Sequence, residues 1–243
     1  MKILIVDDEP PARERLKRLV EEIDSCEVAG EAANGTDAIA LAGRVAPDVV
    51  LMDIRMPGMD GVEAARHLGQ LEEPPAIIFI TAYDEYALRA FDTHAVGYLL
   101  KPVRREKLAD TLARASRLTK PQLAAIARAA APKQRRTHLS VRARGELRLI
   151  PIEEVLFFVA DQKYITVRHA RGEDLIEESL KTLEEEFEPG FLRIHRNTLV
   201  AVRHIASIER SGEGQYSVRM RGLDVELPVS RRLATEVLRR FRG

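Results

Sequence analysis

The segment DVVLMDIRMPGMDG spans residues 48–61 and begins with an apolar run that ends at Asp53. A short apolar run that stops at turn-forming residues is typical of a buried strand. The residues after Asp53 include Pro57 and Gly58, which favour a turn. The segment therefore predicts a buried strand with a carboxylate at its carboxyl end.

Similar apolar runs recur on both sides of this segment, and a helical pattern follows each of them. The predicted strands are residues 2–7, 27–32, 48–53, 76–81 and 95–100. The predicted helices are residues 11–23, Asn34 or Thr36 to about 45, 61–70, 84–92 and 104–117. Strict alternation of strand and helix favours a parallel sheet covered on both faces. We therefore expect an α/β doubly wound (βα)5 domain over residues 1–118.

The pattern changes after residue 118. Residues 119–137 contain an alanine-rich stretch followed by Pro132 and a basic cluster, which indicates a linker whose first half is helical. Residues 138–243 hold short, often alternating apolar runs, which predict a mainly-β domain. The predicted strands there are residues 138–143, 146–150, 155–160, 164–169, 174–179, 205–210, 216–220 and 225–229. Two helices, 179–187 and 230–241, each open with a serine that can cap them.

Composition narrows the class of protein. The single cysteine, Cys26, excludes an internal disulfide framework and a cysteine-rich zinc site. Acids at Asp7 and Asp8 argue against a signal peptide, and no run approaches the roughly 18 apolar residues of a membrane span. We expect a cytoplasmic protein.

The net charge of zero conceals an asymmetry between the two halves. Residues 1–118 contain 15 Lys and Arg against 21 Asp and Glu, whereas the remainder contains 23 against 17. A basic domain suits a polyanionic partner, although a chance division of surface charge would give the same numbers.

Polar residues lie at the carboxyl ends of four predicted strands, where open parallel sheets form their sites. These residues are Asp7 and Asp8, Asp53, Thr81 and Lys101. Clustered carboxylates call for a hard divalent cation, most readily Mg²⁺. A carboxylate can also attack a phosphoryl group, whose charge a lysine and a metal would neutralise. Each residue also has a simpler interpretation, since Asp7 and Asp8 could cap a helix, Asp53 could form a turn, and Lys101 could be solvated.

The motifs DD (7–8), DIRMPGMDG (53–61), FITA (79–82) and GYLLKP (97–102) together resemble the receiver domains of two-component systems. The resemblance implies Asp53 as the phosphoacceptor and Asp7, Asp8 and Asp53 as Mg²⁺ ligands. It further implies Thr81 and Lys101 as phosphate contacts, Tyr98 as an aromatic switch, and a cis peptide between Lys101 and Pro102. Tyr98 could equally be a partly buried tyrosine at the edge of the sheet.

Three polar clusters interrupt the β-rich half, at residues 161–164, 195–197 and 230–232. Arginine can pair with guanine, asparagine with adenine, and both lysine and arginine with phosphates. Arg231 and Arg232 follow a predicted N-cap, where the helix dipole disfavours cations and a phosphate would offset the cost. His195 has no acid or nucleophile nearby in the sequence, so it is either a DNA contact or a structural histidine.

The segments ELRLIPIEEVLFFVADQKYITVRHA, LKTLEEEF, FLRIHRNTLVAVRHIASIER and LPVSRR resemble, in order and spacing, the LytTR output domain. That family places loops of a β-rich domain in successive major grooves of promoter DNA. The resemblance implies contacts from Lys163, Arg196 and Arg231. Their implied neighbours in the interface are Tyr164, His195, Asn197 and Arg232.

Both halves together predict a response regulator that acts as a transcription factor and is not an enzyme. The expected partners are a sensor histidine kinase, double-stranded promoter DNA and a second copy of the chain on that DNA. An alternative is a phosphorylation-dependent adaptor whose C-terminal domain binds protein. A steep salt dependence of binding to duplex DNA would distinguish the two. An enzymatic output domain is a third option, but residues 138–243 show no catalytic constellation.

Overall fold

The structure is a computed structural model, and it describes residues 1–82, 95–116, 135–143, 146–161, 163–211 and 214–241. The chain divides into two compact units, Met1–Pro132 and Lys133–Gly243.

The first unit is a five-stranded parallel sheet in the order β2-β1-β3-β4-β5. Its strands are β1 (Lys2–Val6), β2 (Glu27–Ala32), β3 (Val49–Asp53), β4 (Ala76–Thr81) and β5 (Ala95–Leu100). Its helices are α1 (Pro10–Glu21), α2 (Gly35–Val45), α3 (Gly61–Leu68) and α5 (Arg105–Ala115). The predicted doubly wound fold is confirmed, while the helix predicted at 84–92 lies outside the described residues.

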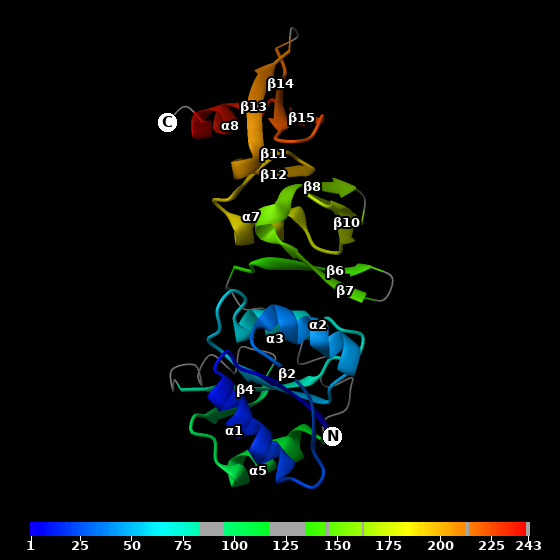
Figure 1. The fold of residues 1–243 in the computed structure, drawn as a ribbon. Helices are drawn as coiled ribbons and strands as arrows, with labels where there is room; N and C mark the ends of the chain where they lie inside the picture. The colour runs from blue at the N-terminus through cyan, green and yellow to red at the C-terminus, as the bar shows by residue number, and fades with distance from the viewer. Residues whose placement is uncertain (83–94, 117–134, 144–145, 162, 212–213, 242–243) are drawn as a thin grey trace. The chain divides into compact units, whose positions relative to one another are not determined.

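Helices cover both faces of this sheet, α1 and α5 on one and α2 and α3 on the other (Figure 1). The central strand β3 is accordingly buried along its whole length. In β1, Ile3 and Ile5 belong to the core beneath α1 and α5, and the alternate residues face the other side. The continuous apolar runs of the sequence thus reflect a sheet without a solvated face.

The start of α3 lies unusually close to the end of β3. A Cβ atom added to Gly61 would lie 2.0 Å from the carbonyl oxygen of Asp53, so only glycine fits there. The backbone N–H of Gly61 also donates to Ile54 O at 2.9 Å. This close approach fixes the loop that begins directly after Asp53.

The second unit contains three antiparallel sheets, of order β10-β9-β8-β12-β11, β13-β14-β15 and β6-β7. Its first strands are β6 (His138–Ala143), β7 (Glu146–Pro151), β8 (Val155–Asp161), β9 (Tyr164–His169) and β10 (Gly172–Ile176). The remaining strands are β11 (Phe191–His195), β12 (Thr198–Ala201), β13 (Ile205–Arg210), β14 (Tyr216–Met220) and β15 (Glu226–Val229). Short 3₁₀ turns, η1 (Ile152–Glu154) and η2 (Val202–His204), precede β8 and β13, and the helices are α7 (Leu180–Phe187) and α8 (Ala234–Phe241).

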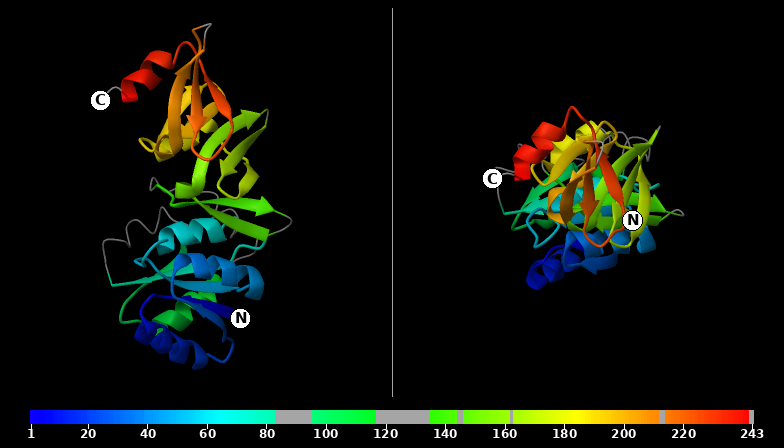
Figure 2. Two further views of the ribbon diagram at one scale, coloured as in Figure 1. Left: turned by 45° about the horizontal axis from the view of Figure 1, so that its top comes forward. Right: turned by 90° about the horizontal axis from the view of Figure 1, so that it is seen from above.

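The five-stranded sheet separates two hydrophobic cores. On one face Phe158 and Leu199 pack with α7 and the β6–β7 hairpin. On the other face Phe157 and Val200 pack with strands β13–β15 and with Val237 of α8. Figure 2 shows the ribbons of β13–β15 in orange to red. The predicted mainly-β domain is confirmed, and Ser179 caps α7 by accepting a hydrogen bond from the backbone N–H of Thr182 at 3.0 Å.

Arg136 is built into the second unit, although its segment reads as a linker in the sequence. Its guanidinium is 5% exposed and donates to the carboxylates of Glu178 and Glu186, in each case with a shortest distance of 2.7 Å. The neighbouring Arg135 donates from Nε to Glu186 O at 3.0 Å. Residues 135 and 136 are therefore fixed on the segment that carries α7.

Two details of the second unit differ from the sequence-based predictions. The hairpin β11–β12 was not predicted as a pair of strands. The helix predicted from Ser230 is assigned instead from Ala234. Residues 231–233 form a turn directly before it, in which Ser230 O accepts from the N–H groups of Leu233 and Ala234 at 3.0 Å each. Arg231 and Arg232 lie in this turn, and the backbone N–H of Ser230 donates to Ile194 O on β11 at 2.8 Å.

Candidate functional site

The carboxyl edge of the parallel sheet brings the predicted acids together. Asp7 follows β1, Asp8 comes next, and Asp53 ends β3. One carboxylate oxygen from each of the three lies within 4.8 Å of those of the other two. Asp7 is fully buried and Asp53 is 7% exposed, so two of these charges are largely removed from water.

Lys101 supplies the compensating charge. Its ammonium lies 2.8 Å from Asp7 Oδ2 and 3.5 Å from Asp53 Oδ2. Its backbone N–H donates to Thr81 O at 2.8 Å, and the Lys101–Pro102 peptide is cis, as predicted. The Thr81 side chain is 1% exposed. The sheet edge thus gathers three acids and one lysine around a single point, with Thr81 at the end of the strand next to Asp53.

The buried charges shift two pKa values. Burial, partly offset by Lys101 and reinforced by Asp7, raises the pKa of Asp53 to about 6. Burial alone would lower the pKa of Lys101, but its hydrogen bond to Asp7 and the negative charges around it raise that pKa. The ammonium of Lys101 is therefore favoured in its charged form, whereas the ionised form of the Asp53 carboxyl is destabilised by its surroundings.

The donor set fits a hard divalent cation. Three carboxylates within reach of one point offer oxygen ligands and excess negative charge, which Mg²⁺ satisfies better than a softer metal. The raised pKa of Asp53 has the same origin, since its carboxylate is incompletely compensated by the residues around it.

This electrostatic cost predicts a pH-dependent effect of Asp53→Asn on stability. The pKa of Asp53 is higher in the folded chain than in the unfolded one, so wild-type stability falls as the pH rises from about 4 to about 6. The amide cannot ionise. Without divalent cations, the variant should be more stable than wild type at pH 7.5, on the order of 2 kcal/mol, and similar at pH 4.

Denaturant unfolding in a chelating buffer measures this difference at both pH values. The exposed Asp24→Asn serves as the control, with no expected effect at either pH. A stabilisation by Asp53→Asn that is equal at pH 4 and pH 7.5 would contradict the electrostatic explanation.

Arg13, which the sequence analysis did not single out, links α1 to the backbone of Asp7 and to β2. Its Nη1 donates to Asp7 O at 2.7 Å, and its Nε lies 3.6 Å from Glu31 on β2. An arginine in the first helix gave no signal in the sequence, because its role depends on how α1 packs. Tyr98 lies half-buried on β5, opposite Phe79 of β4.

The three polar clusters of the β-rich unit lie in three turns at one end of its five-stranded sheet. Lys163 lies between β8 and β9, and Arg196 lies between β11 and β12. The turn that carries Arg196 lies beside the end of β8, where the turn that carries Lys163 begins, because Ala160 N–H donates to Asn197 O at 2.8 Å. The bond from Ser230 to Ile194 brings residues 230–232 to the same end.

The side chains in these turns are accessible. Lys163, Arg196, Arg231 and Arg232 are exposed, and Tyr164 is 40% exposed with Lys163 Nζ 5.6 Å from its ring centroid. His195 and Asn197 are half-buried and hydrogen-bonded to each other.

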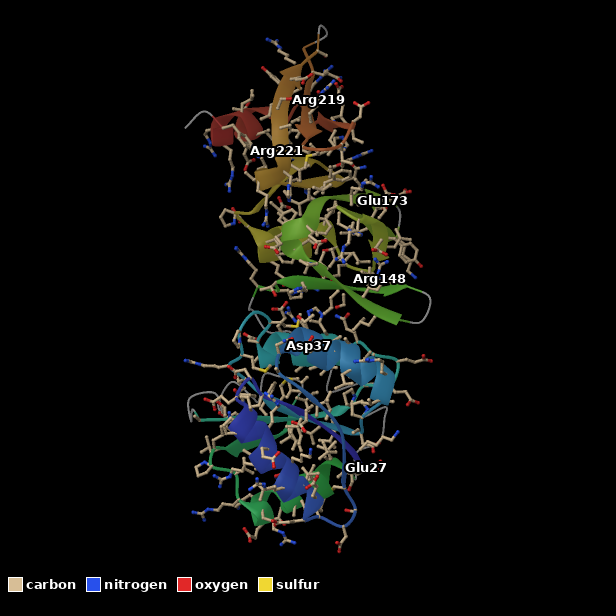
Figure 3. The ribbon with its side chains drawn as sticks, viewed as in Figure 1. Glu27, Asp37, Arg148, Glu173, Arg219 and Arg221 are labelled. Atoms are coloured by element: carbon tan, nitrogen blue, oxygen red, sulfur yellow. The ribbon has the colours of Figure 1, made fainter. Side chains whose placement is uncertain are left out.

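These four turn cations differ from other basic residues of the unit. Arg219 pairs with Glu209 at 3.2 Å and with Glu226 at 2.9 Å, and Arg148 lies 3.5 Å from Asp174. Both arginines are labelled in Figure 3. By contrast, Lys163, Arg196, Arg231 and Arg232 make no ion pair with any residue in the described ranges. The turns therefore carry an uncompensated positive charge that an anionic partner could neutralise.

Comparison with known proteins assigns the family. Residues 3–113 match the model of the response regulator receiver domain, and residues 145–242 match that of the LytTr DNA-binding domain. The Positive alginate biosynthesis regulatory protein of Pseudomonas aeruginosa is 51% identical over 98% of this chain and 98% of its own. The chain is a LytTR-type response regulator.

Two further proteins are similar to all or part of this response regulator. The Transcriptional regulatory protein BtsR of Salmonella typhi is 37% identical, over 96% of this chain and 95% of its own. The crystal structure of the response regulatory domain of mrkE from Klebsiella pneumoniae is 33% identical, covers 48% of this chain and 95% of its own, and gives a TM-score of 0.44. The two family matches confirm the expected combination of receiver and LytTR DNA-binding domains.

In the part of this response regulator that the structure describes, none of the helices has the length and apolar character needed to cross a bilayer.

Proposed function

We propose that this response regulator accepts a phosphoryl group on Asp53 and that this modification controls promoter binding by its LytTR domain. The observation that carries the proposal is the juxtaposition of Asp53 with Asp7, Asp8 and Lys101 at the carboxyl edge of the receiver sheet. The proposed boundaries are a receiver over residues 1–118, a linker over 119–137 and a DNA-binding domain over 138–243.

In the proposed transfer, a carboxylate oxygen of Asp53 forms a bond to phosphorus. The phosphorus–nitrogen bond of a phosphohistidine in a sensor histidine kinase breaks, and the imidazole keeps the electron pair. Asp7, Asp8 and Asp53 would hold Mg²⁺, which when bound supplies positive charge to the phosphoryl oxygens. The ammonium of Lys101 adds charge beside Asp53, and Thr81 offers a hydroxyl donor at the end of the adjacent strand.

The proposed output of this reaction passes through β4 and β5. Thr81 ends β4, and Tyr98 lies on the neighbouring β5. A phosphoryl group that draws the Thr81 hydroxyl toward Asp53 changes the space next to Tyr98. We therefore assign Tyr98 the role of a switch residue.

On the output side, the three turns would bind double-stranded promoter DNA. Lys163, Arg196 and Arg231 are proposed to contact DNA, with Tyr164, His195, Asn197 and Arg232 beside them. Support comes from their gathering at one end of the sheet and from the unpaired charge of the four turn cations. A second copy of the chain would bind the same DNA.

The combination of a receiver domain and a DNA-binding domain also supports a cytoplasmic location and a protein that is not an enzyme. A protein that receives phosphoryl groups from a kinase and binds promoters acts in the cytoplasm, where bacterial DNA lies. In this proposal the output is binding, and the chain catalyses no reaction on another molecule beyond its own phosphorylation.

The test is selection of random genomic DNA fragments by the full-length protein, with and without a beryllofluoride mimic of phosphorylated Asp53. Selective enrichment that the mimic strengthens is the expected result. Enrichment that is indifferent to the mimic would remove control by phosphorylation from the proposal. No enrichment in either state at low salt would overturn DNA binding by this surface.

Replacement of Arg231 by alanine should weaken specific DNA binding by about 1–3 kcal/mol, or roughly 5- to 150-fold, if it pairs with a base. Arg219→Ala is the matched control, because Arg219 is an arginine of the same unit that Glu209 and Glu226 already neutralise. Titration of a selected fragment measures both. Equal affinities for wild type and Arg231→Ala would place the contact elsewhere.

A further inference from the structure

Asn197, in the turn between β11 and β12, has its amide oxygen occupied from inside the protein. The hydroxyl of Thr198 donates to Asn197 Oδ1 at 3.0 Å. The Nδ1 atom of His195 is hydrogen-bonded to the same oxygen. Because an amide oxygen carries no hydrogen, His195 Nδ1 is the donor in this bond. Two donors therefore converge on one acceptor.

This arrangement uses the full acceptor capacity of the side chain. An amide oxygen has two lone pairs, and the amide nitrogen has two N–H donors. Asn197 Nδ2 makes no hydrogen bond to any residue within the described ranges. Toward an external partner, Asn197 thus offers donors only.

The backbone holds this turn in a fixed place, so the orientation of the amide depends on the side chains. Asn197 O accepts from Ala160 N–H at 2.8 Å, and Thr198 pairs with Val159 on β8. Thr198 is 4% exposed, so water does not compete for its hydroxyl. The Thr198 hydroxyl accordingly decides which atoms of Asn197 face outward.

We propose that Thr198 is a positioning residue that makes Asn197 a reader of hydrogen-bond acceptors on DNA. This inference rests on the proposed function, in which this turn binds DNA. The acceptors are guanine O6 and N7 or phosphate oxygens, which share the same chemistry. Adenine recognition requires the amide oxygen to accept from N6 while the nitrogen donates to N7. With that oxygen occupied, the pairing of Asn197 with adenine that the sequence suggests is disfavoured.

Thr198→Val tests this assignment, because valine keeps the shape and removes the donor. The full-length protein with the beryllofluoride mimic is used to select from random duplex DNA, and affinity is measured on the selected site and on copies in which single phosphates are replaced by a neutral methylphosphonate. If Asn197 reads a base, adenine should gain roughly 5-fold or more over guanine at one position. If it contacts a phosphate, base preference stays and the loss of affinity on replacing that one phosphate becomes smaller, while the salt slope, which counts cationic contacts, does not change.

Two further variants separate positioning from a general loss of structure. Thr198→Ser keeps the hydroxyl and should restore the base preference and the phosphate-replacement effects of the wild type. Asn197→Asp keeps an oxygen for both internal donors but removes the outward N–H groups. It should weaken binding roughly 10-fold or more, with the largest loss at the position or phosphate that Thr198→Val affects. Thermal unfolding confirms that each variant is folded.

The outcomes are distinct. A change in one base preference or in the effect of replacing one phosphate, reversed by serine, supports the proposal and identifies the source of the acceptor. Thr198→Val with the base preference and the phosphate-replacement effects of the wild type, whether or not affinity falls uniformly, overturns it. Failure of the wild type itself to select any DNA would instead overturn the proposed function.

Discussion

Asp53→Asn is expected to reduce phosphoryl labelling of the full-length chain to background, with either acetyl phosphate or a phosphorylated histidine kinase as the donor. The amide lacks the nucleophilic oxygen that must bond to phosphorus. Asp7 also lies close to Lys101. However, Asp7 is fully buried, and its Oδ1 accepts from the backbone N–H of Glu9 at 3.0 Å. We therefore expect no other carboxylate to take over.

The matched control is Asp60→Asn, in the same loop region. Asp60 caps α3 by accepting from the backbone N–H of Glu63 at 2.8 Å, and asparagine can cap a helix equally well. This variant should be labelled like the wild type. Labelling that persists in Asp53→Asn, mapped by digestion to any other residue, would show that the phosphoacceptor is misassigned.

Arg136→Ala should destabilise the second unit by about 3–5 kcal/mol, because it leaves the carboxylates of Glu178 and Glu186 without their buried counter-charge. The guanidinium also lies 5.8 Å from the ring centroid of Phe187, so the change loosens packing at the end of α7. Hydrogen exchange of the amides in β8 and β12, which belong to the same core, reports the stability of this unit specifically.

Arg135→Ala provides the comparison for this large effect. Arg135 is exposed, and its side chain donates to backbone carbonyls of Glu186 and Glu188, which water can also satisfy. Its loss should change stability by less than about 1 kcal/mol. Similar protection of β8 and β12 amides in wild type and Arg136→Ala would mean that the ion pairs contribute little net stability.

The receiver fold was predictable from the sequence because its determinants are local. Strands buried on both faces produce unbroken apolar runs, and each of the described strands lies within a residue or so of its predicted bounds. The acidic site was predictable for a related reason. Residues at the carboxyl ends of parallel strands must meet at one edge, whatever the details of packing.

The β11–β12 hairpin was missed because its sequence, FLRIHRNTLVA, reads as polar at its centre. Phe191 and Leu192 are both buried, so the alternation of buried and partly exposed residues begins only at Leu192, and it ends at Arg196 in the turn, which leaves a run too short to stand out. The start of α8 differs from its predicted position by a single turn. Ser230 is a good N-cap by residue type, and its carbonyl does accept from Ala234 N–H, but residues 231–233 between them form a turn that side-chain periodicity does not distinguish from a helix.

Arg136 and Thr198 could not be found from the sequence at all. An arginine after an alanine- and proline-rich stretch suggests a solvated linker, and only the fold places Glu178 and Glu186 around it. Thr198 looks like an ordinary strand residue before Leu199. Its importance depends on which neighbour its hydroxyl reaches, and that depends on side-chain geometry beyond any periodicity.

The bond between Ser230 and Ile194 has a consequence for engineering. The three polar turns of the β-rich unit are held together by main-chain hydrogen bonds, whereas their exposed side chains belong to neither hydrophobic core. Exposed positions such as Lys163, Arg196 and Arg231 can therefore be randomised together in a combinatorial library, with the scaffold beneath them unchanged. If these turns bind DNA as proposed, changing only their exposed side chains would change the DNA sequence that is recognised, while the fold stays the same.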